Sequence, residues 1–281
     1  MKSLRHRVAV ITGAGSGIGA ALAHACAVAE MRVVVADIEL AAAHNTAAQL
    51  RDRGCDAIAA QVDVAERDQL DRLADLTWQT FGRCDLLCNN AGVSVLKPLL
   101  DSDADDWDWV LSVNLRGAVN GVSAFVPRML ARSADASDTH IVNIASMAGL
   151  IPLPGFGVYC ASKHALIGYS EVLQLELAPH AIGVSIVCPG MVATRIQDSA
   201  RNRPALDPAA AATAVAADAA APDFPAELTQ IIAPELVAEK ILNAVRRNQL
   251  YVPTHRAWSR PFRQRSDAIL DAFTAIDRSS D

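Results

Sequence analysis

The sequence lacks the long apolar stretches that mark membrane-spanning and secreted proteins. No apolar run in its 281 residues reaches the about 18 residues that a membrane helix needs. The basic N-terminal residues lead into glycines after only a few apolar positions, whereas a signal peptide needs a longer apolar region and a cleavage site. We therefore expect a cytoplasmic protein without an integral membrane segment.

The sequence also lacks cysteine pairs at metal-binding spacing and an excess of positive charge. Its six cysteines are scattered through apolar segments without a Cys-x-x-Cys pair, which argues for buried reduced thiols and against structural zinc. Its histidines show no mutual spacing that suggests a metal. The formal net charge of −6 argues against a long-range attraction to nucleic acid. We expect neither a metal nor a nucleic-acid partner.

Short apolar runs alternate with longer helical patterns along the chain. Such runs are typical of strands buried on both faces of a sheet, and the alternation predicts right-handed crossovers between parallel strands. The sequence therefore predicts an α/β fold: a Rossmann-like, doubly wound, mostly parallel seven-stranded sheet with helices on both faces. No composition break separates two domains, so we expect a single nucleotide-binding domain over residues 1–281. The expected strands are Arg7–Thr12, Arg32–Ala36, Ala57–Val62, Asp85–Asn89, His140–Ala145, Gly183–Cys188 and Leu250–Val252, and the helical stretches include Leu40–Arg53, Arg67–Phe81 and Trp107–Arg132.

Two segments depart from this alternation. Asp207–Pro222 is dominated by alanine, with a proline near each end and little large apolar surface for packing. We expect it to be a marginal helix or a loop within a substrate-loop region over residues 191–233. The tail over residues 254–281 sets aromatic and aliphatic residues among arginines. This pattern predicts an amphipathic helix that packs on the body or on a neighbouring subunit, with a membrane-surface helix as the alternative.

The first predicted strand runs directly into a glycine-rich turn, Thr12-Gly13-Ala14-Gly15-Ser16-Gly17-Ile18-Gly19. Glycines let the backbone approach a pyrophosphate, and a helix N-terminus supplies N–H groups and a positive dipole end. Asp37 ends the second strand, where a carboxylate can accept hydrogen bonds from the adenosine ribose and would repel a 2′-phosphate. No arginine or lysine lies in the turn or at the two positions after Asp37, so we predict NAD rather than NADP.

Tyr159 and Lys163 lie four residues apart in a helical pattern, so the phenol and the ammonium point into the same cavity. A cation about 5 Å from the phenol favours phenolate by roughly 3 kcal/mol, which predicts that the pKa of Tyr159 falls by about two units. Ser146 follows an apolar strand, at the sheet edge where ligands of open α/β folds bind. Together the three side chains predict proton exchange with an alcohol or carbonyl oxygen.

These residues belong to a pattern that resembles the short-chain dehydrogenase/reductase family. The pattern extends over roughly residues 6 to 252, and its motifs follow the family's order and spacing. They are TGAGSGIG from Thr12 to Gly19, Asp63-Val64, Asn89-Asn90-Ala91-Gly92, Asn114, Ser146, Tyr159 to Lys163, and Pro189-Gly190.

The resemblance implies a role for each matching residue. Ser146, Tyr159 and Lys163 are similar to the family's catalytic residues. Asn114 is similar to the residue that distorts its helix and holds a water on the catalytic lysine. In the implied cofactor-binding set, Asp63 and Val64 contact the adenine, and the segment from Pro189 to Thr194 binds the nicotinamide carboxamide. It comprises Gly13, Ser16, Gly17, Ile18, Gly19, Asp37, Ile38, Asp63, Val64, Asn90, Ala91, Gly92, Tyr159, Lys163, Pro189, Gly190, Val192 and Thr194.

The resemblance also implies the reaction, which is hydride transfer between NAD and the carbon of a small secondary alcohol or ketone. We expect a hydrophobic substrate, alicyclic, aromatic or steroid-like, because the family positions that face the substrate are mostly apolar here and no basic residue among them demands an acidic group. These positions are Val95, Leu96, Met147, Leu150, Ile151, Leu153, Phe156, Met191 and Ile196.

Two other functions and an oligomeric state remain open from the sequence. A 3-ketoacyl-type reductase is one alternative, and a catalytically silent NAD-binding regulatory or scaffold protein is the other. The family implies a homodimer or homotetramer, with Trp107–Arg132 and Val158–Pro179 as the interface helices. Packing on the sheet explains the apolar patterns of those helices equally well.

Overall fold

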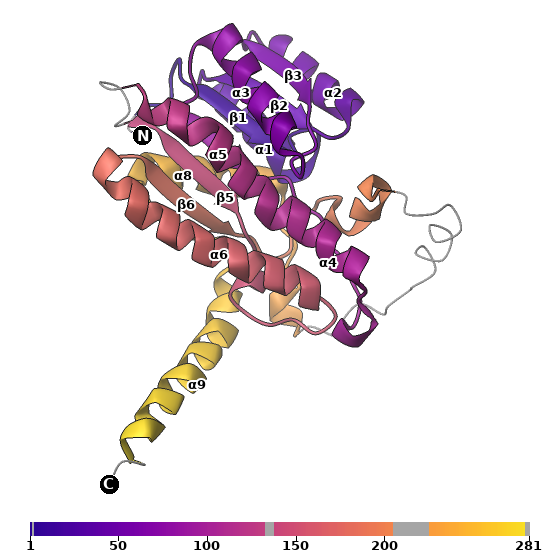
Figure 1. Cartoon of the computed structure of the whole chain (residues 1–281), viewed down its shortest axis with the longest axis vertical. Coiled ribbons are helices and arrows are strands. Elements are labelled where there is room, and N and C mark those ends of the chain that lie inside the picture. Colours follow the sequence, from indigo (N-terminus) through magenta and orange to yellow (C-terminus); the bar gives the residue numbers. More distant parts are fainter. Residues whose placement is uncertain (2, 133–137, 205–224, 279–281) are drawn as a thin grey trace.

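The computed structural model describes residues 1, 3–132, 138–204 and 225–278, and Figure 1 shows their arrangement. Seven strands form one parallel sheet in the order β3-β2-β1-β4-β5-β6-β7, which confirms the predicted fold. Each strand begins and ends within one residue of its predicted run. The strands are β1 Val8–Thr12, β2 Arg32–Asp37, β3 Ala57–Gln61, β4 Leu86–Asn89, β5 His140–Ile144, β6 Gly183–Cys188 and β7 Tyr251–Pro253.

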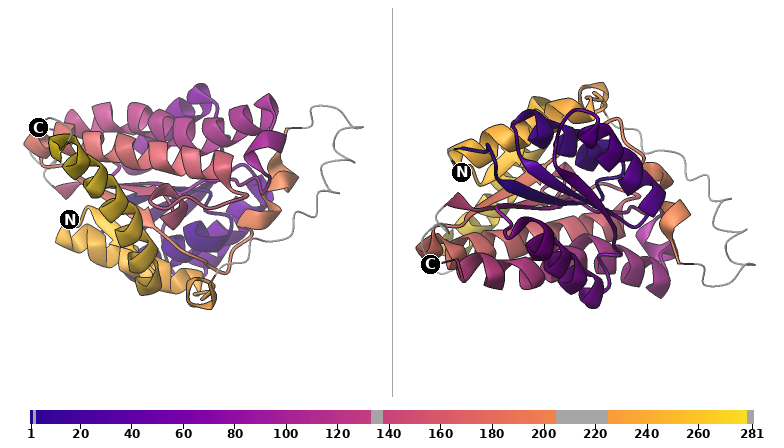
Figure 2. Two further views of the ribbon diagram at one scale, coloured as in Figure 1. Left: turned by 90° about the horizontal axis from the view of Figure 1, so that it is seen from below. Right: turned by 90° about the horizontal axis from the view of Figure 1, so that it is seen from above.

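Helices cover both faces of the sheet (Figure 2). Helices α1, α2 and α8 pack on one face, and α3, α5 and α6 pack on the other. Their bounds are α1 Gly17–Val28, α2 Leu40–Arg51, α3 Arg67–Phe81, α4 Ala104–Leu111, α5 Gly117–Leu130, α6 Gly157–Leu177, α8 Pro234–Arg247 and α9 Ser259–Arg278.

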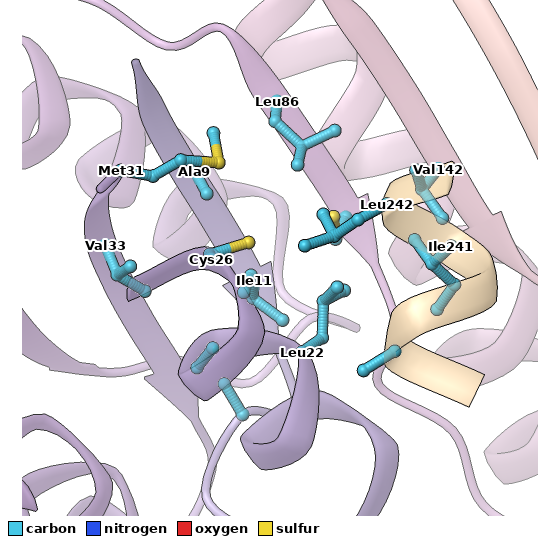
Figure 3. Close-up of a cluster of buried hydrophobic side chains, with 14 of the residues drawn as sticks. Ala9, Ile11, Leu22, Cys26, Met31, Val33, Leu86, Val142, Ile241 and Leu242 are labelled. Atoms are coloured by element: carbon cyan, nitrogen blue, oxygen red, sulfur yellow. The ribbon is translucent and has the colours of Figure 1, made fainter. Parts of the chain in front are cut away.

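Alternating strand residues supply the two halves of the core. In β1, Ala9 and Ile11 face α1 and α8, whereas Val8 and Val10 face the opposite layer. Figure 3 shows the first cluster, in which Leu22 of α1 meets the side chains of α8 across the strands. Because both faces are buried, the strands read as continuous apolar runs, and the sequence pattern was therefore easy to recognise.

The order of the strands fixes where a ligand can bind. The chain crosses from one side of β1 to the other between β3 and β4, so the loops after β1 and β4 diverge and leave a crevice at the carboxyl edge. The glycine-rich turn follows β1 at this edge. The segment that carries Ser146 follows β5 at the same edge.

The long helix predicted over Trp107–Arg132 is interrupted. It begins as α4, with Asp103 and Asp106 forming a reciprocal capping box at its start. A π-helical turn, Ser112–Arg116, then separates α4 from α5. Asn114 lies inside this turn, which confirms the expected helix distortion at that residue.

The two segments that departed from the strand–helix alternation differ in outcome. Asp207–Pro222 lies outside the described residues, and the described part of the substrate loop forms short helical turns at Ile196–Asn202 and Ala226–Leu228. The tail does form the predicted helix, α9, but α9 projects away from the body (Figure 1), so the expectation that it packs on the body was wrong. Among the described residues, no helix is long and apolar enough to cross a membrane.

Candidate active site

A cavity of about 1020 Å³ opens at the carboxyl edge of the sheet. The glycine-rich turn and the ends of the central strands form its floor, and the substrate loop forms its roof. The predicted residues that line it are Gly13, Ser16, Gly17, Ile18, Asp37, Ile38, Asp63, Val64, Asn90, Ala91, Gly92, Ser146, Tyr159, Lys163, Pro189, Gly190, Val192 and Thr194. Gly19 and Asn114 lie directly behind this wall, as described below.

The glycine-rich turn has a backbone that only glycine adopts easily. Gly13 and Gly17 have φ values of +63° and +54°, in the left-handed region that side chains disfavour. A Cβ atom on Gly13 would lie 2.8 Å from the Cα of Ala91, and one on Gly19 would overlap the Gly13 carbonyl oxygen. Helix α1 begins at Gly17, so its free N–H groups and positive dipole end face the cavity, as anion binding requires.

Thr12 and Asn90 brace this turn from the neighbouring strand. The Thr12 hydroxyl accepts hydrogen bonds from the backbone N–H groups of Asn90 and Ala91, at 3.0 and 3.1 Å. The Asn90 amide donates to the carbonyl oxygens of Thr12 and Gly13, at 2.8 and 3.0 Å. Thr12 was not among the predicted site residues, although its place as the last residue of β1 and the first of the glycine motif was a usable signal.

Asp37 is fixed by the backbone on both sides. One carboxylate oxygen accepts from the Gly15 N–H at 2.8 Å, and the other accepts from the Glu39 N–H at 2.9 Å. The N-cap of α2 is Glu39, so the alternative interpretation of Asp37 as the helix cap was wrong. Gly15 was also missed as a site residue, and a Cβ there would lie 2.8 Å from the Asp37 carboxylate.

The adenine end is formed by the residues that follow β3. The Asp63 carboxylate accepts from the Ala65 N–H at 2.9 Å, which fixes the turn after the strand. The amide of Asn120, on α5, donates to the Val64 carbonyl oxygen at 2.9 Å. The pair Asp63 and Val64 is therefore held against the cavity from two directions.

Tyr159 and Lys163 project from the first turns of α6 toward the end of β5. The Lys163 ammonium lies 5.6 Å from the centre of the Tyr159 ring and donates to the Ile144 carbonyl oxygen at 2.8 Å. Ser146 lies within hydrogen-bonding reach of Tyr159. Ser146 itself is held by the Ala148 N–H, which donates to its hydroxyl at 3.1 Å. The structure therefore brings the three predicted side chains together.

The titration of this pair differs from the prediction. Burial raises the pKa of Tyr159 to about 12, although the Ser146 hydrogen bond acts in the opposite direction. Burial also lowers the pKa of Lys163 to about 8. The estimate from sequence counted the attraction between cation and phenolate but omitted the cost of removing both from water, which dominates in a buried site.

Asn114 connects the π turn to the catalytic helix. Its amide group donates to the Val93 carbonyl oxygen at 2.9 Å and to the Ser162 hydroxyl at 3.0 Å, and its oxygen accepts from the Val93 N–H at 2.8 Å. A Cβ on Gly92 would lie 3.3 Å from the Asn114 oxygen and 3.5 Å from the Lys163 ammonium. Asn114 therefore lies close behind Lys163, as the sequence predicted.

The segment after β6 is anchored by a residue that the sequence analysis missed. His255 is buried, and its Nδ1 accepts from the Gly190 N–H at 3.2 Å while its Nε2 contacts the Gln230 carbonyl oxygen at 3.1 Å. Gly190 and Gln230 stand at the two ends of the substrate loop. Because no family motif includes His255, the only signal was a histidine placed directly after the last strand.

A short strap from the substrate loop crosses the cavity near Asp37. The strap comprises residues 195–203 and includes the helical turn Ile196–Asn202. Glu39 accepts from the Arg201 guanidinium at 2.8 Å and from the Asn202 amide at 3.2 Å. The bonds from Asn202 and then Arg201 lower the pKa of Glu39 despite its partial burial. The strap thus connects the loop to the start of α2.

The far end of the strap is fixed by a second ionic cluster. The Asp106 carboxylate is buried and accepts from the Arg203 guanidinium at 2.7 Å and from the Lys97 ammonium at 2.8 Å. The Arg203 guanidinium also lies 5.3 Å from the centre of the Trp109 ring. The expectation that no basic residue lines the pocket was incomplete, because Arg116, Arg195, Arg201 and Arg203 all line it. Three of these four form ion pairs with the chain's own acids.

The apolar end of the cavity agrees with the prediction in part. Met147, Leu153, Phe156, Met191 and Ile196 line it. Leu150 and Ile151 instead pack into a core cluster, Val95 packs in another, and Leu96 does not line the cavity. Trp109 and Trp258 line the cavity but were not predicted. Trp258 follows the last strand in a part of the chain that the family motifs do not reach.

The whole arrangement fits an extended dinucleotide. The left-handed glycines leave room for a pyrophosphate against the start of α1, and the Asp37 carboxylate stands where a ribose would lie. The opposite end gathers a phenol, a hydroxyl and an ammonium group beside an apolar wall. A group that binds at one end and reacts at the other would span the cavity.

Known proteins share this sequence and this fold. The chain is 38% identical over 186 residues to a probable oxidoreductase, EphD, of Mycobacterium tuberculosis, a match that covers 66% of this chain but only 31% of that protein. It is 32% identical over 282 residues to a C alpha-dehydrogenase of a Sphingobium species, covering 99% of this chain and 90% of the relative.

A solved structure and a family model agree with these relatives. The crystal structure of a short-chain dehydrogenase/reductase from Burkholderia phymatum in complex with NAD superimposes with a TM-score of 0.84, at 36% identity and 96% coverage of both chains. The family model described as short chain dehydrogenase matches residues 7–205. The chain therefore belongs to the short-chain dehydrogenase family of oxidoreductases.

Proposed function

We propose that this protein is an NAD-dependent oxidoreductase that interconverts a hydrophobic secondary alcohol and its ketone. The observation that carries the proposal is the meeting of Tyr159, Lys163 and Ser146 at one end of a cavity whose other end holds Asp37. The bound nicotinamide supplies the acceptor or donor of hydride. The protein supplies orientation, proton transfer and a dry site.

Tyr159 is the proton-transfer residue in this proposal. Its hydroxyl takes the proton of the alcohol during oxidation and returns one to the carbonyl oxygen during reduction. Ser146 donates a hydrogen bond to the same substrate oxygen and stabilises the charge that develops there. Lys163 holds its positive charge near the phenol and binds the nicotinamide ribose. The proton then leaves through the region of Asn114, which lies beside Lys163.

The choice of NAD follows from Asp37. The carboxylate is held in place by the N–H groups of Gly15 and Glu39. A ribose with two free hydroxyls can donate to this carboxylate, whereas a 2′-phosphate would be repelled by it. The nearest strap arginine, Arg201, is paired with Glu39. A 2′-phosphate would have to compete with that pair for its charge.

The substrate class follows from the wall opposite Tyr159. The side chains there are Met147, Leu153, Phe156, Met191 and Trp258, which together form an apolar surface beside a polar reacting end. Such a pocket favours alicyclic, aromatic or steroid-like alcohols over small polyols. We place the protein in the cytoplasm, as one nucleotide-binding domain that assembles as a dimer or tetramer.

The test is the absorbance of reduced nicotinamide during incubation with a panel of hydrophobic secondary alcohols, with NAD+ and NADP+ in parallel. Turnover with NAD+ would support the proposal and rank the substrates. Better turnover of small polyols would contradict the substrate class. Efficient reduction of 3-ketoacyl thioesters with NADPH would instead favour a 3-ketoacyl-type reductase. Tight NADH binding with no turnover on alcohols, ketones or thioesters would favour a silent NAD-binding scaffold.

A further inference from the structure

Helix α9 leaves the body of the protein with its apolar side chains in solvent. After the buried Trp258, the helix extends away from all other elements (Figure 1). Leu270, Phe273 and Ile276 are 61%, 65% and 59% exposed. A monomeric soluble protein rarely exposes a contiguous apolar surface of this kind, and such a surface marks an interaction site. The proposed chemistry uses no residue of α9.

The apolar residues of α9 follow the spacing of a coiled-coil seam. Phe262, Ile269 and Ile276 are seven residues apart, and Phe273 lies four residues after Ile269. These positions fall on one side of a helix, in the alternating pattern of three and four residues by which helices pack knobs into holes. A shallow groove runs along this side, and the small residues Ala268 and Ala272 are part of its lining. An aliphatic or aromatic side chain from another helix would fit between them.

The charges of α9 differ between its two ends. Residues 259–266 contain three arginines and no acid, whereas residues 267–277 contain three aspartates and no base. Two such helices in parallel would place arginine beside arginine. In the antiparallel orientation the basic start of each helix lies beside the acidic end of the other, and the helix dipoles also oppose. The sequence of α9 is therefore complementary to a second copy of itself.

We propose that α9 pairs antiparallel with α9 of a second copy of this chain, about a twofold axis. In the register that aligns the seam, Ile269 of one copy packs against the partner's Phe273, and the reverse contact follows by symmetry. The two Leu270 side chains then lie opposite each other near the axis, at the edge of the seam. Asp267 and Asp271 fall on the outer side of the pair, where they stay in water.

The length of α9 sets the strength and the shape of this assembly. Its 20 residues span about 30 Å, at about 1.5 Å per residue, so the two bodies sit at opposite ends of the pair without colliding. About three heptads bury a modest apolar area, so we expect association to depend on concentration in the micromolar range. Outward aspartates make a membrane surface a poor alternative partner, because they would face anionic lipid.

The first test compares two single substitutions in the full-length protein by sedimentation velocity over a range of concentrations. Phe273→Glu places a charge in the seam and should weaken the α9 association step at least tenfold, whereas Asp271→Asn changes the outer side and should leave it unchanged. Helical circular dichroism and NADH binding verify that both variants are folded. Equal association of the two variants would overturn the proposal.

The second test distinguishes pairing of the two helices from docking of α9 on the partner's body. Under mild oxidation, Leu270→Cys should form an intermolecular disulfide in high yield, because the two positions face each other across the axis. Asp267→Cys, on the outer side, should cross-link at the background level of the unsubstituted chain. If Phe273→Glu weakens association but Leu270→Cys does not cross-link, α9 docks elsewhere and the antiparallel pair is wrong. Vesicle binding that is lost in Phe273→Glu, without any self-association, would assign α9 to a membrane instead.

Discussion

The two sides of the cavity are built in different ways. The floor, from the glycine-rich turn to Asn90, is held by short hydrogen bonds between side chains and backbone that link adjacent strands. The roof, formed by the strap, is held at its Asp37 end by the partly exposed Glu39–Arg201 pair. The floor is therefore a rigid template, whereas the roof is attached by contacts that water and salt can weaken.

This difference separates binding from exchange. A preformed floor orients the cofactor without further ordering, which favours affinity. A weakly attached roof can open for the cofactor to enter and leave, and such steps often limit turnover. Changes in the floor should therefore alter chemistry and selectivity strongly, and changes in the roof should alter rates of release by small factors.

The largest effect is expected at the reacting end of the floor. Tyr159→Phe removes the proton-transfer group but keeps the ring that packs beside Phe156. We expect kcat to fall by roughly 10²–10⁴-fold, the usual contribution of a positioned acid or base, with NADH affinity nearly unchanged. Steady-state kinetics and a fluorescence titration measure the two. Tyr169→Phe, on the same helix but outside the cavity lining, is the matched control, and retained turnover in Tyr159→Phe would refute the assignment.

The next effect concerns cofactor choice at Asp37. Asp37→Asn removes the negative charge but keeps an oxygen that can accept from the Gly15 N–H. We expect the ratio of NADPH to NADH affinity to rise by roughly ten- to a thousandfold, because a charge pair at about 4 Å is worth about 1–4 kcal/mol. Asp63→Asn changes the same charge at the adenine end and should move the ratio far less. An unchanged ratio in Asp37→Asn would place the discrimination elsewhere.

A third effect follows from the pKa values of the buried pair. Oxidation requires phenolate at Tyr159 beside a protonated Lys163, and the pKa of Lys163 is about 8 while that of Tyr159 is about 12. Below about pH 8 this form needs the loss of one proton, so kcat/KM for oxidation should rise about tenfold per pH unit. Above that pH it carries the same number of protons as the dominant form, so the profile should level off. A flat profile between pH 6 and pH 8, with the chemical step limiting, would contradict this pairing.

The smallest effect is expected at the roof. Arg201→Gln removes the ion pair between the strap and Glu39, and stopped-flow displacement should show NADH leaving roughly two- to fivefold faster, as a partly exposed pair contributes about 0.2–1 kcal/mol. Arg67→Gln breaks a comparable surface pair with Asp71 that does not line the cavity. It should leave the rate unchanged. A larger effect from Arg67→Gln than from Arg201→Gln would remove the strap from cofactor exchange.

The sequence predicted the floor better than the roof for a physical reason. Buried strands, left-handed glycines and a helical i, i+4 pair each impose a local requirement that a few adjacent residues satisfy, so Gly13, Asp37 and Tyr159 were recognisable. His255 and Arg201 act through partners far away in the sequence, and no local pattern marks them. The strap was expected only as part of a loop, and its contact with Glu39 spans 162 positions.

The pKa of Tyr159 shows a second kind of limit. The spacing of Tyr159 and Lys163 correctly predicted that the two groups are close, but it carried no information about how much water surrounds them. Burial was the larger effect and had the opposite sign. The orientation of α9 was unpredictable for a related reason, because an amphipathic pattern states which face is apolar and does not identify what covers it.

The π turn at Ser112–Arg116 acts as a phase shift along one continuous helix. A single extra residue rotates everything beyond it by about 100°, because an α-helix has about 3.6 residues per turn. Before the turn, Trp109 and Val110 pack toward α6; after it, Phe125 and Met129 pack toward α3 and the sheet. One rod thus presents two faces with different orientations, and Asn114 occupies the point where they change over. Removing one residue between 112 and 116 would restore an unbroken α-helix, and only one of the two faces could then keep its partner.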